Sequence, residues 1–151
     1  MIRKIPVESI VALLVALFVY TALSKLIDFS KFSSEIHNQP LPRWLINILV
    51  FAIPGSEMIL VVMLLTKSVR LYGLLFSFAL LLVFTIYTGL ILVRSFDYIP
   101  CSCAGIFSSM SWSTHLIVNV VFTTLALLGF LMERRRHKNS LPPENIRDTS
   151  A

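Results

Sequence analysis

Charged residues are scarce in this chain, at 14% of 151 residues, whereas hydrophobic residues make up 56%. The mean hydropathy of +0.82 is far too apolar for a soluble domain of this length, so soluble enzymes and soluble binding modules are excluded. Cysteine is almost absent: there are two, whereas an iron–sulfur cluster normally requires four. No internal repeat of about 20 to 50 residues is visible either. These absences leave a small membrane protein as the class to consider.

The chain does contain four long apolar runs. Each holds about 20 residues, which at about 1.5 Å per residue is enough to cross a hydrocarbon core of about 30 Å. Transmembrane strands would be about half as long and would alternate, so we predict an all-α, polytopic membrane protein built as a four-transmembrane-helix bundle. The expected helices cover residues 7–24, 44–66, 71–93 and 114–132 in a domain of residues 1–133, followed by a basic and then disordered tail, 134–151.

The placement of the basic residues predicts the orientation of the bundle. With the N-terminus in the cytoplasm, the inner segments as far as Lys138 carry eight lysines and arginines and the outer loops carry four. The positive-inside rule then places both termini in the cytoplasm, and we expect a bacterial inner-membrane protein. The inner set is Arg3, Lys4, Lys67, Arg70, Arg134, Arg135, Arg136 and Lys138, and the outer set is Lys25, Lys31, Arg43 and Arg94.

The basic cluster ERRRHK directly follows the last apolar run. A cluster in this position is ordinarily a stop-transfer signal that contacts lipid headgroups. We therefore expect the lipid bilayer, and no nucleic acid, as its partner.

The two cysteines, Cys101 and Cys103, lie in the stretch DYIPCSCAG of the second outer loop. In a bacterium this loop faces the periplasm, where paired thiols usually become disulfides. A disulfide between residues i and i+2 closes a very small ring, so it adds little stability, is strained and exchanges readily. Gly105 permits a sharp turn beside the pair, and Arg94 offers positive potential that favours the thiolate. The spacing therefore predicts a reactive pair.

Two other interpretations of the cysteines stay open. Structural cysteines are usually buried, but they need no paired spacing. A metal site would need further ligands, with His37, Met110 and His115 as the candidates, yet no tight pattern of several ligands appears. We therefore predict no metal site.

Polar residues interrupt the apolar runs. Glu57 is expected near the bilayer midplane, three residues after Pro54, which should kink the helix. A charged side chain at this depth costs about 2.5–3.5 kcal/mol or more, so Glu57 must be protonated, paired or hydrogen-bonded. Thr85, Thr88 and Thr123 are the candidate partners. A structural hydrogen bond and a role in proton transfer both stay open.

Two further polar groups are predicted to face the bundle rather than lipid. His115 and Asn119 share one stripe of the last helix with Thr123, at spacings of four residues. Near the outer end of the first helix, a second cluster comprises Thr21, Ser24, Lys25 and Asp28.

Three segments together resemble one family: TALSKLIDFSKF, PGSEMILVVMLL, and PCSCAGIF followed by SWSTHLIVN. They are similar to the DoxX-like membrane proteins, specifically the branch represented by the methylamine-utilisation protein MauE, over nearly all of the chain except its tail. The outer-loop motif of this branch is Cys-x-Cys-Phe-Gly, in which Ala104 here replaces the aromatic residue. The positions that match the branch are Lys25, Asp28, Phe29, Phe32, Pro54, Glu57, Cys101, Cys103, Gly105 and Asn119.

The resemblance implies periplasmic thiol–disulfide chemistry, linked in the MauE branch to maturation of the disulfide-rich small subunit of methylamine dehydrogenase. Other DoxX relatives include a subunit of a thiosulfate:quinone oxidoreductase. We expect the Cys101–Cys103 pair to exchange electrons with a periplasmic thioredoxin-fold protein or a disulfide-containing substrate. Such a chain would be a thiol–disulfide oxidoreductase.

A membrane quinone is a candidate cofactor that would reset the pair. Aromatic residues of the third helix would hold it, with Glu57 handling protons; these residues are Phe76, Phe78, Phe84 and Tyr87. The alternative function is a non-catalytic membrane anchor or assembly factor for a periplasmic redox enzyme. A transporter is less favoured, because four helices with one intramembrane acid offer little of a polar pathway. The sequence is compatible with a monomer or an oligomer.

Overall fold

The computed structural model describes residues 5–39, 41–93 and 112–140, and every regular element in these ranges is a helix. Four helices are long and apolar enough to cross a membrane. They are α1 (Ile5–Ile27), α3 (Arg43–Leu65), α4 (Arg70–Leu92) and α5 (Trp112–Ser140). The prediction of an all-α membrane protein with four spans is therefore confirmed. The last helix continues through the basic segment as far as Ser140.

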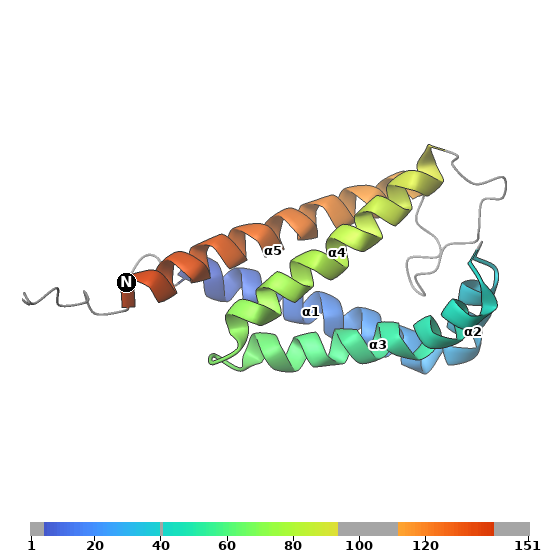
Figure 1. Cartoon of the computed structure of the whole chain (residues 1–151), viewed down its shortest axis with the longest axis horizontal. Helices are drawn as coiled ribbons and strands as arrows, with labels where there is room; N and C mark the ends of the chain where they lie inside the picture. Colours follow the sequence, from blue (N-terminus) through green and yellow to red (C-terminus); the bar gives the residue numbers. More distant parts are fainter. Residues whose placement is uncertain (1–4, 40, 94–111, 141–151) are drawn as a thin grey trace, which may run out of the picture.

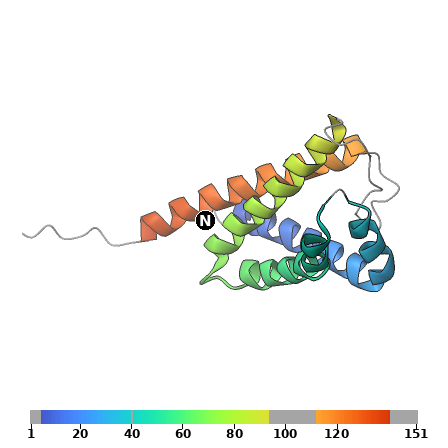
Figure 2. The ribbon, with the colours of Figure 1, turned by 45° about the vertical axis from the view of Figure 1, so that its right-hand side comes forward.

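The long helices are arranged as two pairs (Figure 1). α4 packs mainly on α5, and α1 packs mainly on α3. α1 begins and α5 ends at one end of the bundle, where the turn of residues 66–69 also joins α3 to α4, and we call this the turn end. At the opposite end α1 leads into the short helix α2 (Phe29–His37), which lies beside the start of α3 (Figure 2). We call this the α2 end.

α2 is a helix that the sequence did not predict, since the segment between the first two spans was expected to be a loop. Asp28 is its N-cap, and the Asp28 carboxylate accepts a hydrogen bond from the Lys31 backbone N–H at 3.4 Å. The helix is amphipathic: Phe32 and Ile36 are buried and pack on the first half of α3, whereas Lys31 is exposed. α2 thereby covers the bundle at this end.

The larger of two buried hydrophobic clusters among the described residues extends to the turn end. Leu14, Leu64 and Leu74, from three different helices, are fully buried there. Gly73 of α4 allows the close approach of α3, because a Cβ at this position would lie 3.1 Å from the Met63 carbonyl carbon. The small residue therefore sets the distance between α3 and α4 beside their connecting turn.

Arg70, the first residue of α4, ties three helices together at the turn end. Its Nε donates a hydrogen bond to the Leu64 carbonyl oxygen at 3.2 Å, and its Nη1 lies 2.8 Å from Glu8 Oε1. The side chain of Arg70 is 6% exposed and that of Glu8 is 49% exposed. This buried guanidinium is therefore hydrogen-bonded to α3 and paired with a carboxylate that still reaches the surface.

Candidate functional site

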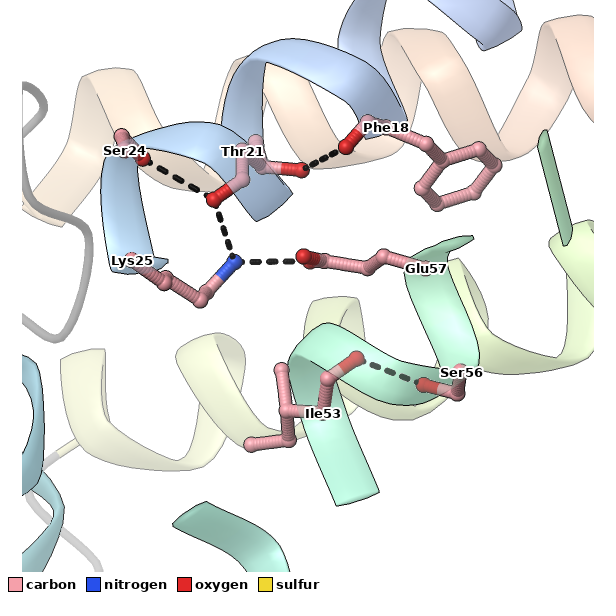
Figure 3. A network of polar contacts seen from close by, with 7 residues as sticks. All are labelled: Phe18, Thr21, Ser24, Lys25, Ile53, Ser56 and Glu57. Carbon is pink, nitrogen blue, oxygen red and sulfur yellow. Dashed lines mark hydrogen bonds and ion pairs between the residues drawn. The ribbon is translucent and has the colours of Figure 1, made fainter. Parts of the chain in front are cut away.

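A buried ion pair joins α1 to α3 (Figure 3). Lys25 Nζ lies 2.7 Å from Glu57 Oε1, and the two side chains are 10% and 4% exposed. Helical side chains point back toward the N-terminus of their helix, and Lys25 Nζ also donates to the Thr21 carbonyl oxygen, one turn earlier, at 3.4 Å. A lysine in the last turn of α1 thereby reaches a carboxylate near the middle of α3.

The second oxygen of Glu57 is buried and has no hydrogen-bond partner among the described residues. The neighbouring Thr21 hydroxyl donates to the Phe18 carbonyl oxygen at 3.2 Å, and the Ser24 hydroxyl donates to the Thr21 carbonyl oxygen at 2.9 Å. Figure 3 shows both hydroxyls directed at the backbone of α1. Buried acceptors normally have a donor, so Glu57 Oε2 is an atom that a bound molecule can satisfy.

Glu57 lies in a part of α3 that contains a proline, and Lys25 has a neighbour from α2. Pro54, one turn before it, is buried, and α3 continues on both sides of this proline. The Ser56 hydroxyl donates to the Ile53 carbonyl oxygen at 2.8 Å. From α2, the Phe32 ring lies over Lys25, with its centroid 5.9 Å from Nζ, a distance at which a cation and a ring attract.

Lys25 and Glu57 line a cavity of about 410 Å³ at the α2 end. All five helices contribute to its wall, and its volume falls in the range of about 300–1,000 Å³ found for small-molecule sites. Most of the wall is apolar, as in such sites, and a minority of its residues carry polar side chains. These polar residues are Thr21, Lys25, Gln39, Glu57, Tyr87, Thr88, His115 and Asn119.

Several of these polar groups are hydrogen-bonded across helices. The Tyr87 hydroxyl of α4 donates to Gln39 Oε1, and Gln39 Nε2 donates to the Glu35 carbonyl oxygen at 3.1 Å. On the other side of the wall, Asn119 Nδ2 of α5 donates to Thr88 Oγ1 of α4 at 3.4 Å. The polar part of the wall is therefore fixed by contacts between helices that are distant in sequence.

The expected partners of Glu57 require a correction. Thr85 and Thr123 bond to each other, with their hydroxyl oxygens 2.9 Å apart, and the Thr88 hydroxyl donates to its own helix. In the described structure the partner of Glu57 is Lys25, which the sequence had assigned to a separate polar cluster. This pairing depends on how far α1 is displaced along α3. The spacing of residues within one helix does not predict that displacement.

The structure brings four of the predicted site residues to one cavity: Lys25, Glu57, His115 and Asn119. The predicted stripe on the last helix does face the bundle, since Asn119 and Thr123 bond to α4. Asp28 is exposed and caps α2 instead. Arg94, Cys101, Cys103 and Gly105 lie outside the described residues, and the roles assigned to them stay predictions.

The aromatic residues proposed for a quinone lie in three different places. Phe84 and Tyr87 line the cavity. Phe76 lines a groove between α3 and α4 on the outside of the bundle, and Phe78 packs against the core.

Sequence reasoning missed Gln39, which follows α2 and lines the cavity because that unpredicted helix directs the chain inward.

The helices that precede and follow the cysteine segment in the chain both line this cavity. Residues 94–111 connect the end of α4 to the start of α5. Thr88, in the last turns of α4, and His115, in the first turn of α5, both line the cavity. The two helix ends that flank the cysteine segment are thus part of the cavity wall.

A comparison with known proteins adds a family assignment. No curated protein and no solved structure matches the chain significantly. Residues 3–132 match the model of the family described as methylamine utilisation protein MauE. This range takes in α1 to α4 and most of α5, and it includes Lys25, Glu57 and both cysteines. The likeness to the wider DoxX-like group stays a prediction, whereas the match over most of the chain shows that this multi-pass membrane protein belongs to the MauE family.

Proposed function

We propose that this protein carries out thiol–disulfide exchange at the bacterial inner membrane, through the Cys101–Cys103 pair. The spacing of the two cysteines and the membership of the MauE family support the proposal. The observation that carries it is the position of the flanking helices. Thr88 and His115, on the two helices that precede and follow the thiol segment in the chain, both line the polar cavity inside the membrane domain.

The exchange uses a mixed disulfide. A partner thiolate attacks one sulfur of the Cys101–Cys103 disulfide, which breaks that S–S bond, forms an intermolecular one and releases the other cysteine as a thiolate. A second partner thiolate then attacks the partner sulfur of the mixed disulfide, which completes the partner disulfide and releases the second cysteine. Two electrons pass to the pair, and the two thiolates take up two protons. The same steps in reverse reduce a partner disulfide.

The partner is a periplasmic protein with exchangeable thiols, either of the thioredoxin fold or a disulfide-containing substrate. This requires the α2 end to face the periplasm and both termini to lie in the cytoplasm. The basic residues at the end of α5, Arg134 to Lys138, lie at the turn end, and the positive-inside rule supports this orientation.

Thiol trapping in intact cells tests the function. Cells are acid-quenched and labelled with a bulky, membrane-impermeant maleimide before and after reduction, and the gel shift of the protein is recorded. We expect a mixture of oxidised and reduced pairs that moves with added periplasmic oxidant or reductant. In Cys103→Ser, Cys101 can still attack a partner that carries a disulfide, and the resulting mixed disulfide should accumulate because the second cysteine that would resolve it is missing. Ser102→Ala should behave as the parent.

Replacement of both cysteines by serine separates the two candidate roles. A thiol oxidoreductase loses partner oxidation or reduction altogether. Retention of partner maturation by the double variant would contradict the exchange function, and so would cysteines that stay reduced and unreactive. Either result would point to the non-catalytic assembly factor.

A further inference from the structure

The cavity around Lys25 and Glu57 lies next to a second space that opens on the outside of the bundle. This space is a groove of about 450 Å³ between α3 and α4, with Ile59 and Phe76 among its exposed apolar walls. Leu80 and Val83 line both the groove and the cavity, so the two spaces meet at these side chains. In a protein whose α3 and α4 span a membrane, this face contacts acyl chains. The groove therefore lies between the bilayer and the cavity, with Leu80 and Val83 at the boundary between the two spaces.

The charges of the cavity favour an uncharged ligand head. Lys25 is the one lysine or arginine on the described wall, and Glu57 already compensates its charge at 2.7 Å. A phosphate headgroup needs cationic partners beyond a compensated pair. The apolar majority of the wall likewise suits a ring or a chain better than an ion.

The hydrogen-bonding groups of the pair specify the polar atoms of that head. Glu57 Oε2 is buried without a donor among the described residues, so it calls for a hydroxyl on the ligand. The Lys25 ammonium has three N–H donors, two of which are directed at Glu57 Oε1 and the Thr21 carbonyl oxygen. Its third N–H suits a carbonyl. Donor and acceptor side by side fit a ring that carries a carbonyl in one redox state and a hydroxyl in the other.

We propose that the cavity binds the ring of an isoprenoid quinone or quinol, which enters from the bilayer between α3 and α4 past Leu80 and Val83. The tail stays in the groove, and the aromatic side chains of Phe84 and Tyr87 border the ring. This inference rests on the proposed function for its redox role alone. Oxidation of the Cys101–Cys103 dithiol to a disulfide releases two electrons and two protons, the number that converts a quinone to a quinol. Binding itself needs no cysteine.

A matched pair of substitutions tests the lateral route. Val83 and Val62 are the same residue type with the same exposure, 63% and 62%, but only Val83 lines the groove and the cavity. The full chain is placed in lipid nanodiscs and photolabelled with an azido-ubiquinone, and the labelled peptides are quantified by mass spectrometry. Val83→Trp should reduce labelling of cavity peptides by about tenfold, because the added ring fills the entrance. Val62→Trp should leave the labelling unchanged.

Competition identifies the part of the ligand that is recognised. Decylubiquinone should displace the label, and decanol, which has a similar chain without the ring, should not. Equal competition by decanol, or no labelling of the cavity at all, would overturn the quinone site. Equal labelling of the Val83→Trp and Val62→Trp proteins would overturn entry between α3 and α4. If Val83→Trp does not insert, Ala79→Phe fills the same groove from an exposed position.

The failures of the two proposals are distinguishable. The Cys101→Ser/Cys103→Ser protein should bind the azido-ubiquinone as the parent does, because the label reports the cavity and not the thiols. Labelling without any thiol exchange would support the quinone site and overturn the proposed function. Thiol exchange in a protein whose cavity takes no label would support the proposed function and overturn the quinone site.

Discussion

Among the residues that the structure describes, two ion pairs join different helices, one toward each end of the bundle, and their surroundings differ. At the turn end Arg70 is buried but Glu8 is half exposed, and the guanidinium has a second partner in the Leu64 carbonyl oxygen. Toward the α2 end both Lys25 and Glu57 are buried, and one carboxylate oxygen has no donor in the described chain. The first pair lies beside close packing and the second lies beside a cavity.

The difference indicates what each end contributes. A buried ion pair often stabilises a protein less than apolar side chains of the same volume would, because both charges lose their hydration. A cavity likewise removes packing contacts. The α2 end combines both costs, whereas the turn end has closely packed leucines and a glycine contact. The turn end is therefore the part of the fold without these two costs, and the α2 end is the part that binding and chemistry can use.

The largest expected effect comes from breaking the buried pair. Glu57→Leu leaves Lys25 charged and buried without its partner, which should lower the free energy of unfolding by about 3–5 kcal/mol. Lys25→Met combined with Glu57→Leu should recover most of this loss, since no uncompensated charge remains. The surface-reaching partner at the turn end is the control: Glu8→Gln should cost about 1 kcal/mol or less. Unfolding in mixed micelles measures the free energy of unfolding of each variant. Equal losses of this free energy in Glu57→Leu and Glu8→Gln would contradict the contrast between the two ends.

A smaller effect is expected from the glycine contact at the turn end. A Cβ on Gly73 would lie 3.1 Å from the Met63 carbonyl carbon and 3.2 Å from the Leu64 backbone nitrogen, so Gly73→Ala forces α3 and α4 apart. We expect a loss of about 1–3 kcal/mol. Gly89, on the same helix toward the α2 end, has no atom within 4 Å of such a Cβ, so Gly89→Ala should stabilise the helix by about 0.5–1 kcal/mol. Thermal unfolding in one detergent compares the two, and a neutral Gly73→Ala would show that the turn end is loosely packed.

The smallest expected effect is a pH dependence at Glu35 on α2. Burial raises the pKa of this carboxyl above its ordinary value of 4.5; Lys31 opposes the shift and Asp28 adds to it. A raised folded-state pKa contributes stability below pH 4.5, and that contribution is lost as the pH rises through the folded-state pKa. Glu35→Gln should therefore become progressively more stable than the parent between about pH 4.5 and neutral pH. Denaturation curves of both proteins across this pH range give the difference in their free energies of unfolding. A difference that does not change with pH would contradict the raised pKa of Glu35.

The sequence predicted the spans well because each apolar run is long enough to cross a membrane without help from its neighbours. It predicted the inward stripe of Asn119 and Thr123 for a similar reason, since the spacing of residues within one helix fixes the shared face. Both features depend on a single helix. The structure confirms both features. The helix bounds differ from the prediction by one to three residues, except that α5 ends at Ser140 instead of residue 132.

The features that the sequence did not predict depend on several helices together. α2 has nine residues, with serines and a histidine on its polar face, and such a segment is marginal as a helix until Phe32 and Ile36 are buried on α3. The pairing of Lys25 with Glu57 depends on how far α1 is displaced along α3. The cavity depends on all five helices, and the proposed roles of Cys101 and Cys103 still await their test.

The Lys25–Glu57 pair has a consequence for how the protein is made. Its members are 32 residues apart on different spans, and spans enter the bilayer in order as the chain is synthesised. α1 arrives first, with a lysine in its last turn that can still reach water at the interface, whereas α3 arrives with a carboxylate near its middle that cannot. The lysine already in place gives this carboxylate its partner once α3 packs against α1. The charge on Glu57 is therefore compensated only when the second long span has assembled on the first, and a Lys25→Met chain should be degraded by membrane proteases faster than a Lys25→Met/Glu57→Leu chain.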